Sequence, residues 1–243
     1  MGVSSSCNRT LKWSDLVGRR RMVSIPEFEE EGGAMVVEPL ARPVLFDVGG
    51  VLVNSHPDPA YIAELIGDGS SELVSLVDQA MWANRDAYDA GASDRDFWDR
   101  VSGDCGQPQV SDEVLAKLVE HDSMRMHDAD PEAVALIDEL AQAGARLGIL
   151  SNAPRPIADQ IRRASWAKSF TSFVFSCDAG SCKPHRQIYR ESLEAFEVDP
   201  ADVIFFDDRK KNIRAAQLLG IHGILWTGAA QAREDLKDLG ILA

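Results

Sequence analysis

Short apolar runs alternate along most of the chain with segments of helical period. Strands buried on both faces of a sheet are expected at five such runs, 43–47, 147–150, 173–176, 203–206 and 223–226. Helices are expected between them, at 131–143, 186–196 and 212–219, where Asp130-Pro131 is a start signal and Gly144 and Gly220 are stop signals. Strands that alternate with helices predict an α/β fold with a Rossmann-like parallel sheet and right-handed crossovers.

The segment between the first two predicted strands is too long for one crossover. Asp47 and Ser151, which end these strands, are 104 positions apart, whereas a crossover with its helix needs only about a dozen residues or somewhat more. Four stretches within it look helical, at 59–66, 71–87, 94–101 and 112–121. We therefore predict an α-helical cap domain over residues 56–125, inserted into a core formed by 41–55 and 126–243.

Residues 1–40 differ from the rest of the chain. They mix Ser, Gly, Arg and a run of acidic residues with little periodicity, which predicts a disordered extension. Its three consecutive arginines are followed by a polar segment and not by an apolar one, so a secretion signal is not expected.

The formal net charge of −14 limits the partners of the chain. Binding to nucleic acid needs clustered Lys and Arg, and docking on anionic membranes needs basic surfaces, so neither is expected. A small phosphorylated substrate remains compatible, because a metal ion and a few local cations can hold a phosphate. The four cysteines show no zinc-type spacing. We expect a cytoplasmic protein that is a monomer or a homodimer.

Polar side chains stand at the ends of four predicted strands or in the loops that follow. They are Asp47, Ser151-Asn152, Lys183 and Asp207-Asp208, the last pair with Asn212 shortly after. In open α/β sheets, ligands bind at the carboxyl ends of the strands. A carboxylate there can attack phosphorus, a hydroxyl can hold phosphate oxygens, a lysine can offset charge, and paired carboxylates can hold Mg²⁺.

These residues resemble the four motifs of the haloacid dehalogenase (HAD) superfamily. The first motif is FDVGGVLV at 46–53, the second is ILSN at 149–152, the third is Lys183-Pro184 followed by Ile188-Tyr189, and the fourth is IFFDD at 204–208 with Asn212. The resemblance covers roughly residues 43–228, and the motifs occur in the family's order. It implies hydrolase activity and a cap that closes over the substrate.

The resemblance also implies residue roles. Asp47 corresponds to the nucleophile, Ser151 to the phosphate-binding hydroxyl and Lys183 to the charge-balancing amine. It further implies bound Mg²⁺, held by Asp47, the Gly49 backbone carbonyl, Asp207 and Asp208. Further candidates for contact with phosphate or substrate are Asn152, Gly50, His56, Arg85 and Asp89. Trp82 and Tyr88 are predicted to be core aromatic residues more readily than substrate contacts.

One position departs from most phosphatases of the family. They carry a second Asp two residues after the nucleophile, as general acid and then base, whereas this chain has Gly49. Such a group contributes about 10²–10⁴-fold in rate. Its absence is compatible with a good leaving group, with a proton donor in the cap, or with weak catalysis. The Asp-x-Gly-Gly-Val form of this chain resembles a branch of the family that includes sugar-phosphate phosphatases with Gly at this position.

Three functions therefore compete. The first is a Mg²⁺-dependent phosphatase that forms an aspartyl-phosphate on Asp47 and acts on a small, sugar phosphate-like metabolite. The second is a 2-haloacid dehalogenase, which also uses an Asp nucleophile; related dehalogenases, however, show a different first motif and lack the Asp207-Asp208 pair in this form. The third is a non-catalytic protein that binds a phosphorylated metabolite. The motifs favour the phosphatase.

Overall fold

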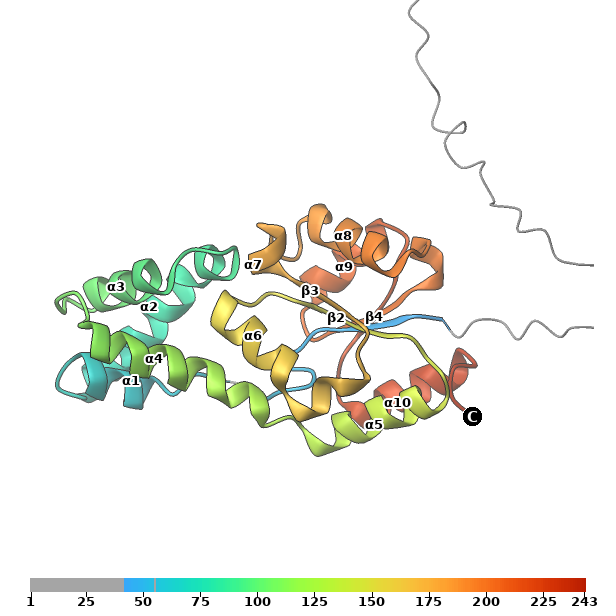
Figure 1. Cartoon of the computed structure of the whole chain (residues 1–243), viewed down its shortest axis with the longest axis horizontal. Helices are drawn as coiled ribbons and strands as arrows, with labels where there is room; N and C mark the ends of the chain where they lie inside the picture. Colours follow the sequence, from blue (N-terminus) through green and yellow to red (C-terminus); the bar gives the residue numbers. More distant parts are fainter. Residues whose placement is uncertain (1–41, 55) are drawn as a thin grey trace, which may run out of the picture. The chain divides into compact units, whose positions relative to one another are not determined.

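The computed structural model describes residues 42–54 and 56–243, and the extension predicted at residues 1–40 lies outside them. Within the described residues, five parallel strands form one sheet in the order β3-β2-β1-β4-β5 (Figure 1). The strands are β1 (Val44–Phe46), β2 (Leu147–Ser151), β3 (Ser172–Phe175), β4 (Ile204–Asp207) and β5 (His222–Leu225). The predicted α/β class with a parallel sheet is confirmed.

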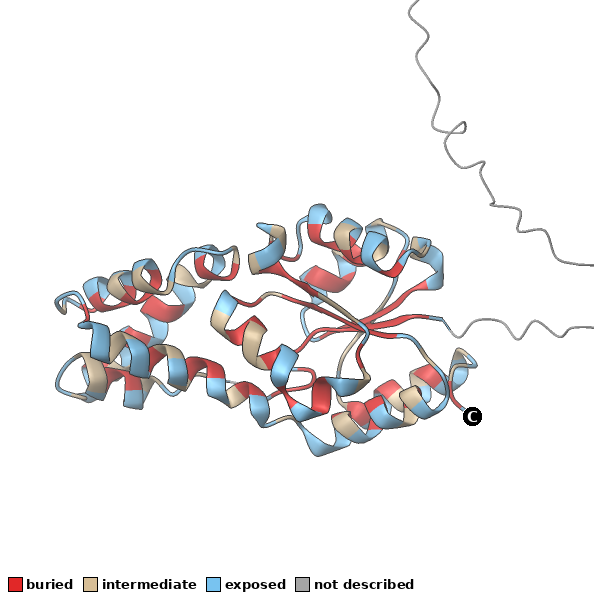
Figure 2. Cartoon of the chain, viewed as in Figure 1, coloured by how far each residue is buried: buried red, intermediate tan, exposed pale blue. Residues whose placement is uncertain are grey.

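Helices cover both faces of this sheet. Side chains along a strand alternate between the faces, and β1 follows this rule because Val44 and Phe46 join one hydrophobic cluster while Leu45 joins another. The cluster of Phe46 includes residues of α5 (Pro131–Gln142), α6 (Arg155–Arg163) and α10 (Ala229–Asp238), and that of Leu45 includes residues of α8 (Arg186–Phe196) and α9 (Lys210–Leu218). Figure 2 shows buried residues on the sides of these helices that face the strands. The central strands β1, β2 and β4 are buried throughout, as expected for a parallel sheet covered twice.

A helical insertion separates β1 from β2. It consists of α1 (Pro59–Ile66), α2 (Ser71–Asp89), α3 (Asp94–Asp104) and α4 (Asp112–Met124). Each helix begins after a side-chain cap, because Asp58, Ser70, Ser93 and Ser111 accept hydrogen bonds from backbone N–H groups of the first turn. The insertion has a hydrophobic cluster of its own, in which Tyr88, Phe97 and Trp98 are almost completely buried.

Short elements complete the described chain. They are the 3₁₀ helices η2 (Arg125–His127), η3 (Ser165–Ser169) and η4 (Pro200–Asp202), together with α7 (Ser176–Ala179). Two of them position the site, since η2 links the insertion back to the core and α7 follows β3 at the carboxyl edge of the sheet. No helix of the described residues has the length and apolarity needed to cross a bilayer.

Candidate active site

The register of the three central strands brings the predicted polar residues together. Phe46 pairs with Ile149 of β2 and with Phe206 of β4, so the next residue, Asp47, lies between the ends of these two strands. The backbone N–H of Asp47 donates to the Phe206 carbonyl at 2.9 Å. Ser151 ends β2 and Asp207 ends β4, which places a carboxylate, a hydroxyl and a second carboxylate side by side.

The Asp47 carboxylate is held at both oxygens. Oδ1 accepts hydrogen bonds from the Val48 backbone N–H and from the Ser151 hydroxyl, each at 2.7 Å. Oδ2 forms an ion pair with Lys183 Nζ at 2.9 Å. Asp47 is 7% exposed and lines a pocket. A carboxylate fixed in this way has a defined orientation and keeps contact with the space in which a substrate would lie.

Lys183 is the cation at the centre of the site. Its ammonium group donates to Asp207 Oδ2 at 2.7 Å and to the Leu150 carbonyl at 2.8 Å, in addition to the ion pair with Asp47. Two of the three donors of the ammonium group are used in these hydrogen bonds, and the contact with Asp47 is an ion pair. The residue is only 3% exposed, so it is not a solvated loop lysine, and its charge offsets those of two buried carboxylates.

The acidic pair at the end of β4 completes the cluster. Carboxylate oxygens of Asp47, Asp207 and Asp208 lie within 4.8 Å of one another. Burial, together with the nearby charge of Asp47, raises the pKa of Asp207 to about 6, although Lys183 opposes this shift. Burial and Asp47 also raise the pKa of Asp208. Three carboxylates facing one ammonium group leave an excess of negative charge, which a divalent cation would relieve.

The donor set of this cluster fits Mg²⁺ in particular. Mg²⁺ prefers oxygen ligands, and the cluster offers carboxylates only. A second observation supports the fit. The Asn212 amide nitrogen donates to both oxygens of Asp207 at 3.0 Å, whereas its buried Oδ1 has no hydrogen-bond partner among the described residues. An unsatisfied buried acceptor is costly, and a metal-bound water is one group that satisfies it.

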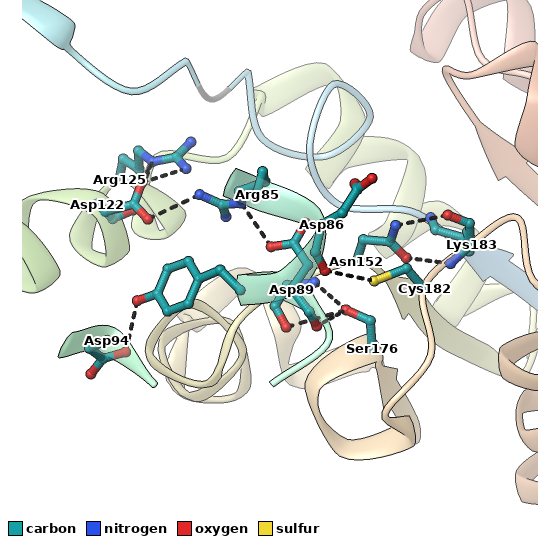
Figure 3. Close-up of polar contacts among 12 residues, drawn as sticks. Arg85, Asp86, Asp89, Asp94, Asp122, Arg125, Asn152, Ser176, Cys182 and Lys183 are labelled. Atoms are coloured by element: carbon teal, nitrogen blue, oxygen red, sulfur yellow. Dashed lines mark hydrogen bonds and ion pairs between the residues drawn. The ribbon is translucent and has the colours of Figure 1, made fainter. Parts of the chain in front are cut away.

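A pocket of about 300 Å³ opens above these residues. Its wall is formed on the core side by the residues just described, and on the other side by side chains of the insertion and of η2. Those side chains include Trp82, Arg85, Asp86, Asp89, Arg125 and Met126. Figure 3 shows Arg85 between Asp89 and Asp122, with Asn152 and Lys183 on the adjoining core segments. The pocket therefore joins the cluster of carboxylates and lysine to a charged wall of the insertion.

Comparison with known proteins agrees with this geometry. The sequence model of a family described as "Hydrolase: haloacid dehalogenase-like hydrolase" matches residues 42–220. The chain belongs to this family. The predicted membership of the HAD superfamily is thereby confirmed, and the protein is a hydrolase.

Several relatives of this HAD hydrolase are phosphatases by name. The sesquiterpene phosphatase astK of Aspergillus oryzae is 24% identical over 82% of this chain and 96% of its own length. The phosphoglycolate phosphatase of Rhodospirillum rubrum is 23% identical over 84% and 86%. The flavin mononucleotide hydrolase 1 of Arabidopsis thaliana is 39% identical, but the match spans only 30% of each chain.

Solved structures share the fold. A HAD family enzyme of Bacteroides thetaiotaomicron in complex with magnesium and inorganic phosphate has a TM-score of 0.58 at 20% identity, covering 76% of this chain and 93% of that one. An L-2-haloacid dehalogenase has the same TM-score and identity, covering 76% and 83%. The fold alone therefore does not separate phosphatase from dehalogenase, and the site has to do so.

The structure brings nearly all the predicted site residues of this hydrolase to one pocket. Ten of the eleven line it: Asp47, Gly49, Gly50, His56, Arg85, Asp89, Ser151, Asn152, Lys183 and Asp208. Asp207 lies directly behind them and is fully buried. Their roles toward substrate and metal stay predictions.

Two of these residues are engaged in ways that the sequence did not indicate. Gly50 was a candidate for contact with phosphate or substrate, and its backbone N–H donates to the Val53 carbonyl at 2.9 Å within the turn after β1. Asn152 uses its amide to bind the Lys183 backbone, accepting from its N–H at 2.7 Å and donating to its carbonyl at 3.1 Å. Asn152 therefore fixes the loop that carries the lysine.

Other pocket residues were missed or misplaced. Tyr88 is a core residue as predicted, but Trp82 is 45% exposed and lines the pocket, so its predicted core position was wrong. Arg125 was not predicted as a site residue, and neither was its partner Asp122, which binds both Arg125 and Arg85. The only sequence signals were the spacings Arg85-Asp89 and Asp122-Arg125, four and three residues apart, which are common on solvated helices.

Proposed function

We propose that this HAD hydrolase is a Mg²⁺-dependent phosphatase that acts on a small phosphorylated metabolite, sugar phosphate-like in size, through Asp47. The observation that carries the proposal is the cluster of three carboxylates within 4.8 Å, whose two buried members are bridged by Lys183. Displacement of halide from carbon requires no divalent cation, whereas phosphoryl transfer gains from a cation that neutralises phosphate charge. A pocket of about 300 Å³ suits a small substrate.

In the proposed reaction, an Asp47 carboxylate oxygen attacks phosphorus and the bond between phosphorus and the ester oxygen breaks. The leaving oxygen takes up a proton from solvent, and an aspartyl-phosphate remains on Asp47. Water then attacks this phosphorus, releases inorganic phosphate and restores the carboxylate. Ser151 and Lys183 orient the nucleophile throughout, since they hold its two oxygens.

The bound cation would be held by Asp47, Asp207, Asp208 and the Gly49 carbonyl, and it would supply charge neutralisation to the phosphoryl group. Gly49 offers no side chain for proton transfer. Turnover should therefore depend strongly on the acidity of the leaving alcohol. His56 and Asp86 are candidates to supply the proton transfer that Gly49 cannot. Both have ionisable side chains, line the same pocket and are exposed.

The test is a phosphate-release assay on p-nitrophenyl phosphate, acetyl phosphate and a panel of sugar phosphates, with Mg²⁺ or with EDTA. We expect Mg²⁺-dependent turnover that Asp47→Asn lowers by more than about 10³-fold. The matched control is Asp238→Asn, an exposed acid at the end of α10, which should retain wild-type turnover. Release of chloride from 2-chloropropionate in EDTA would instead establish a dehalogenase, and binding of phosphate esters without turnover would establish a non-catalytic protein.

A further inference from the structure

The wall of the pocket opposite Asp47 contains two guanidinium groups that share one buried carboxylate. Arg85, on α2, donates from Nη1 to Asp122 at 3.2 Å, and Arg125, on η2, donates from Nη2 to the same carboxylate at 2.9 Å. Asp122 is 2% exposed. Both arginines line the pocket. With Asp89, which also pairs with Arg85, the two arginines and two carboxylates balance in formal charge, so this wall presents guanidinium donors and not a net charge to the pocket.

Arg85 is held as a rigid donor. Its Nε donates to Asp89 at 2.8 Å and its Nη1 to Asp122, so two carboxylates from different helices fix the plane of the guanidinium group (Figure 3). Among the described residues, Nη2 has no hydrogen-bond partner, and it is not one of the buried unsatisfied atoms. This nitrogen is therefore accessible to an acceptor. A planar guanidinium group held in this way suits a carboxylate or a phosphate.

The unused donors of the two guanidinium groups favour an anion over a neutral group. Arg125 has a second nitrogen, Nη1, that is buried and without a partner among the described residues. Burial, together with the neighbouring Arg85, lowers the pKa of Arg125 although Asp122 opposes the shift. The remaining acid at Arg85 is Asp89, whose pKa is raised mainly by burial. Asp86 is exposed and its carboxylate has no hydrogen bond within the described chain, so solvent screens it.

We propose that Arg85, fixed by Asp89 and Asp122 and backed by Arg125, receives a second anionic group of the substrate, so that the enzyme prefers phosphate esters that also carry a carboxylate or a second phosphate. This inference rests on the proposed phosphatase function, because it assumes that the first phosphate lies at Asp47. The shared chemistry is a compact anion at the far end of a small phosphate ester. Arg85 is then a residue that determines specificity and not a catalytic one.

The experiment compares matched substrates. A series of phosphorylated hydroxy acids with two to five carbons is assayed beside the alkyl phosphates of equal length, and a second series replaces the carboxylate by a phosphate. We expect kcat/KM of the wild type to favour the esters with a second anionic group over the alkyl phosphates at one chain length by at least about 10-fold, through a lower KM. The series that gives the larger increase in kcat/KM over the alkyl phosphates identifies the second anionic group as a carboxylate or a phosphate.

The variants are Arg85→Gln and Arg85→Lys. Gln removes the charge, and we expect it to reduce the preference for the acidic ester about 10- to 100-fold, the range of a lost hydrogen bond to a charged group. Lys keeps the charge without the planar fork and should recover part of the preference. The matched control is Arg95→Gln, because Arg95 also pairs with the acid four residues later, Asp99, and with a distant one, Asp112, yet it lies outside the pocket.

Each result of these measurements either supports or overturns the inference. A wild-type enzyme without preference for acidic esters overturns the inference, whether or not Arg85→Gln folds. An equal loss of preference in Arg95→Gln overturns it as well, because the effect would then be one of general stability. If p-nitrophenyl phosphate and all other esters stay intact, the proposed function fails, and this inference is then tested by calorimetric binding of the acidic and the neutral esters. Tighter binding of the acidic ester that Arg85→Gln abolishes supports the inference. Equal binding of the two esters overturns it.

Discussion

Asp207 is the buried side chain on which the cation site depends most. Its two oxygens are held by Lys183, Asn212 and the backbone N–H of Arg209. Burial and the charge of Asp47 raise its pKa to about 6. Below this pH, the folded protein carries Asp207 as a neutral acid, and a cation has to displace its proton in order to bind. Above it, Asp207 is already ionised.

We therefore predict that Mg²⁺ affinity is nearly constant from pH 7 to pH 8 and weakens about tenfold per pH unit as the pH falls below 6. Calorimetric titration of the wild type at pH 5, 6, 7 and 8 measures this directly. In Asp207→Asn, the affinity should be lower than in the wild type, and it should change less between pH 7 and pH 5 because only Asp208 and Asp47 then titrate with the cation site. A wild-type dissociation constant that is equal at pH 5 and pH 7 contradicts the prediction.

Gly50 tests the geometry of the same cation site from the backbone side. It adopts a left-handed φ of +76°, and a Cβ added there would lie 2.6 Å from Asp208 Oδ2. Gly50→Ala should therefore displace the Asp208 carboxylate and weaken Mg²⁺ binding, in addition to a backbone strain of about 1–2 kcal/mol. The free energy of unfolding and the Mg²⁺ dissociation constant are measured together.

The control for this variant is Gly144→Ala. Gly144 has a similar φ of +80°, but an added Cβ meets nothing within 4 Å. It should show the same loss of stability without a change in Mg²⁺ affinity. If both variants bind Mg²⁺ like the wild type, Asp208 is not a ligand of the cation.

At the scale of single elements, β2 and α8 pack so closely that Gly148 leaves less room for an added Cβ than any other glycine of the described chain. A Cβ on Gly148 would lie 2.2 Å from the Phe196 ring and 2.8 Å from a Leu45 methyl group. Both neighbours are buried. Gly148→Ala should lower the free energy of unfolding by about 1–3 kcal/mol, because α8 has to move away from the sheet.

Gly103→Ala is the matched control for the same measurement by urea unfolding. Gly103 lies in the last turn of α3, and an added Cβ meets nothing within 4 Å. Alanine should leave stability unchanged or raise it by up to about 1 kcal/mol, since it favours the helix. Equal stabilities of the two variants would show that the packing of α8 on β2 is loose.

The sequence predicted elements well where local signals exist. The helix predicted at 186–196 has the observed bounds, and 59–66 likewise matches α1, where Asp58 and Pro59 mark the start. The helix predicted at 71–87 continues to Asp89, because its stop signal is Gly91. This glycine has a φ of +107°, and the Ala92 N–H donates to the Ala87 carbonyl at 3.0 Å, as at a helix end of the Schellman type. Helix α6 was not predicted individually; its N-cap residue is Pro154, which provides no side-chain cap.

At the scale of the whole molecule, the parallel sheet and the insertion were predictable, whereas the order of the strands and the contact between insertion and core were not. The distance along the chain between Asp47 and Ser151 required an inserted segment, and parallel strands place their carboxyl ends together. Nothing local, however, indicates that Asp122 reaches Arg85, 37 positions away, or that the carbonyl of Asp89 meets Ser176, 87 positions away. Such pairs depend on how helices of the insertion pack on one another and on the core.

Ser176 connects the insertion with the loop after β2. It is fully buried, its hydroxyl donates to the Asp89 carbonyl at 2.6 Å, and the same oxygen accepts from the Ala153 N–H at 2.9 Å (Figure 3). One hydroxyl thereby joins the end of α2, which carries Arg85, to the loop that carries Asn152. A rigid link at this place should keep the two walls of the pocket at a fixed separation.

We predict that Ser176→Ala lowers the free energy of unfolding by about 1–3 kcal/mol, because a buried N–H and a buried carbonyl lose their partner. It should also raise KM severalfold with a smaller effect on kcat, since the walls separate while Asp47 and Lys183 stay in place. Ser192→Ala is the control: Ser192 is equally buried, but its hydroxyl bonds only to Tyr189 within α8. The control should lose about 1 kcal/mol of stability and keep its KM. If both variants keep the wild-type KM, then the hydroxyl of Ser176 stabilises the fold without setting the width of the pocket. The separation of the two walls would then depend on the bound substrate.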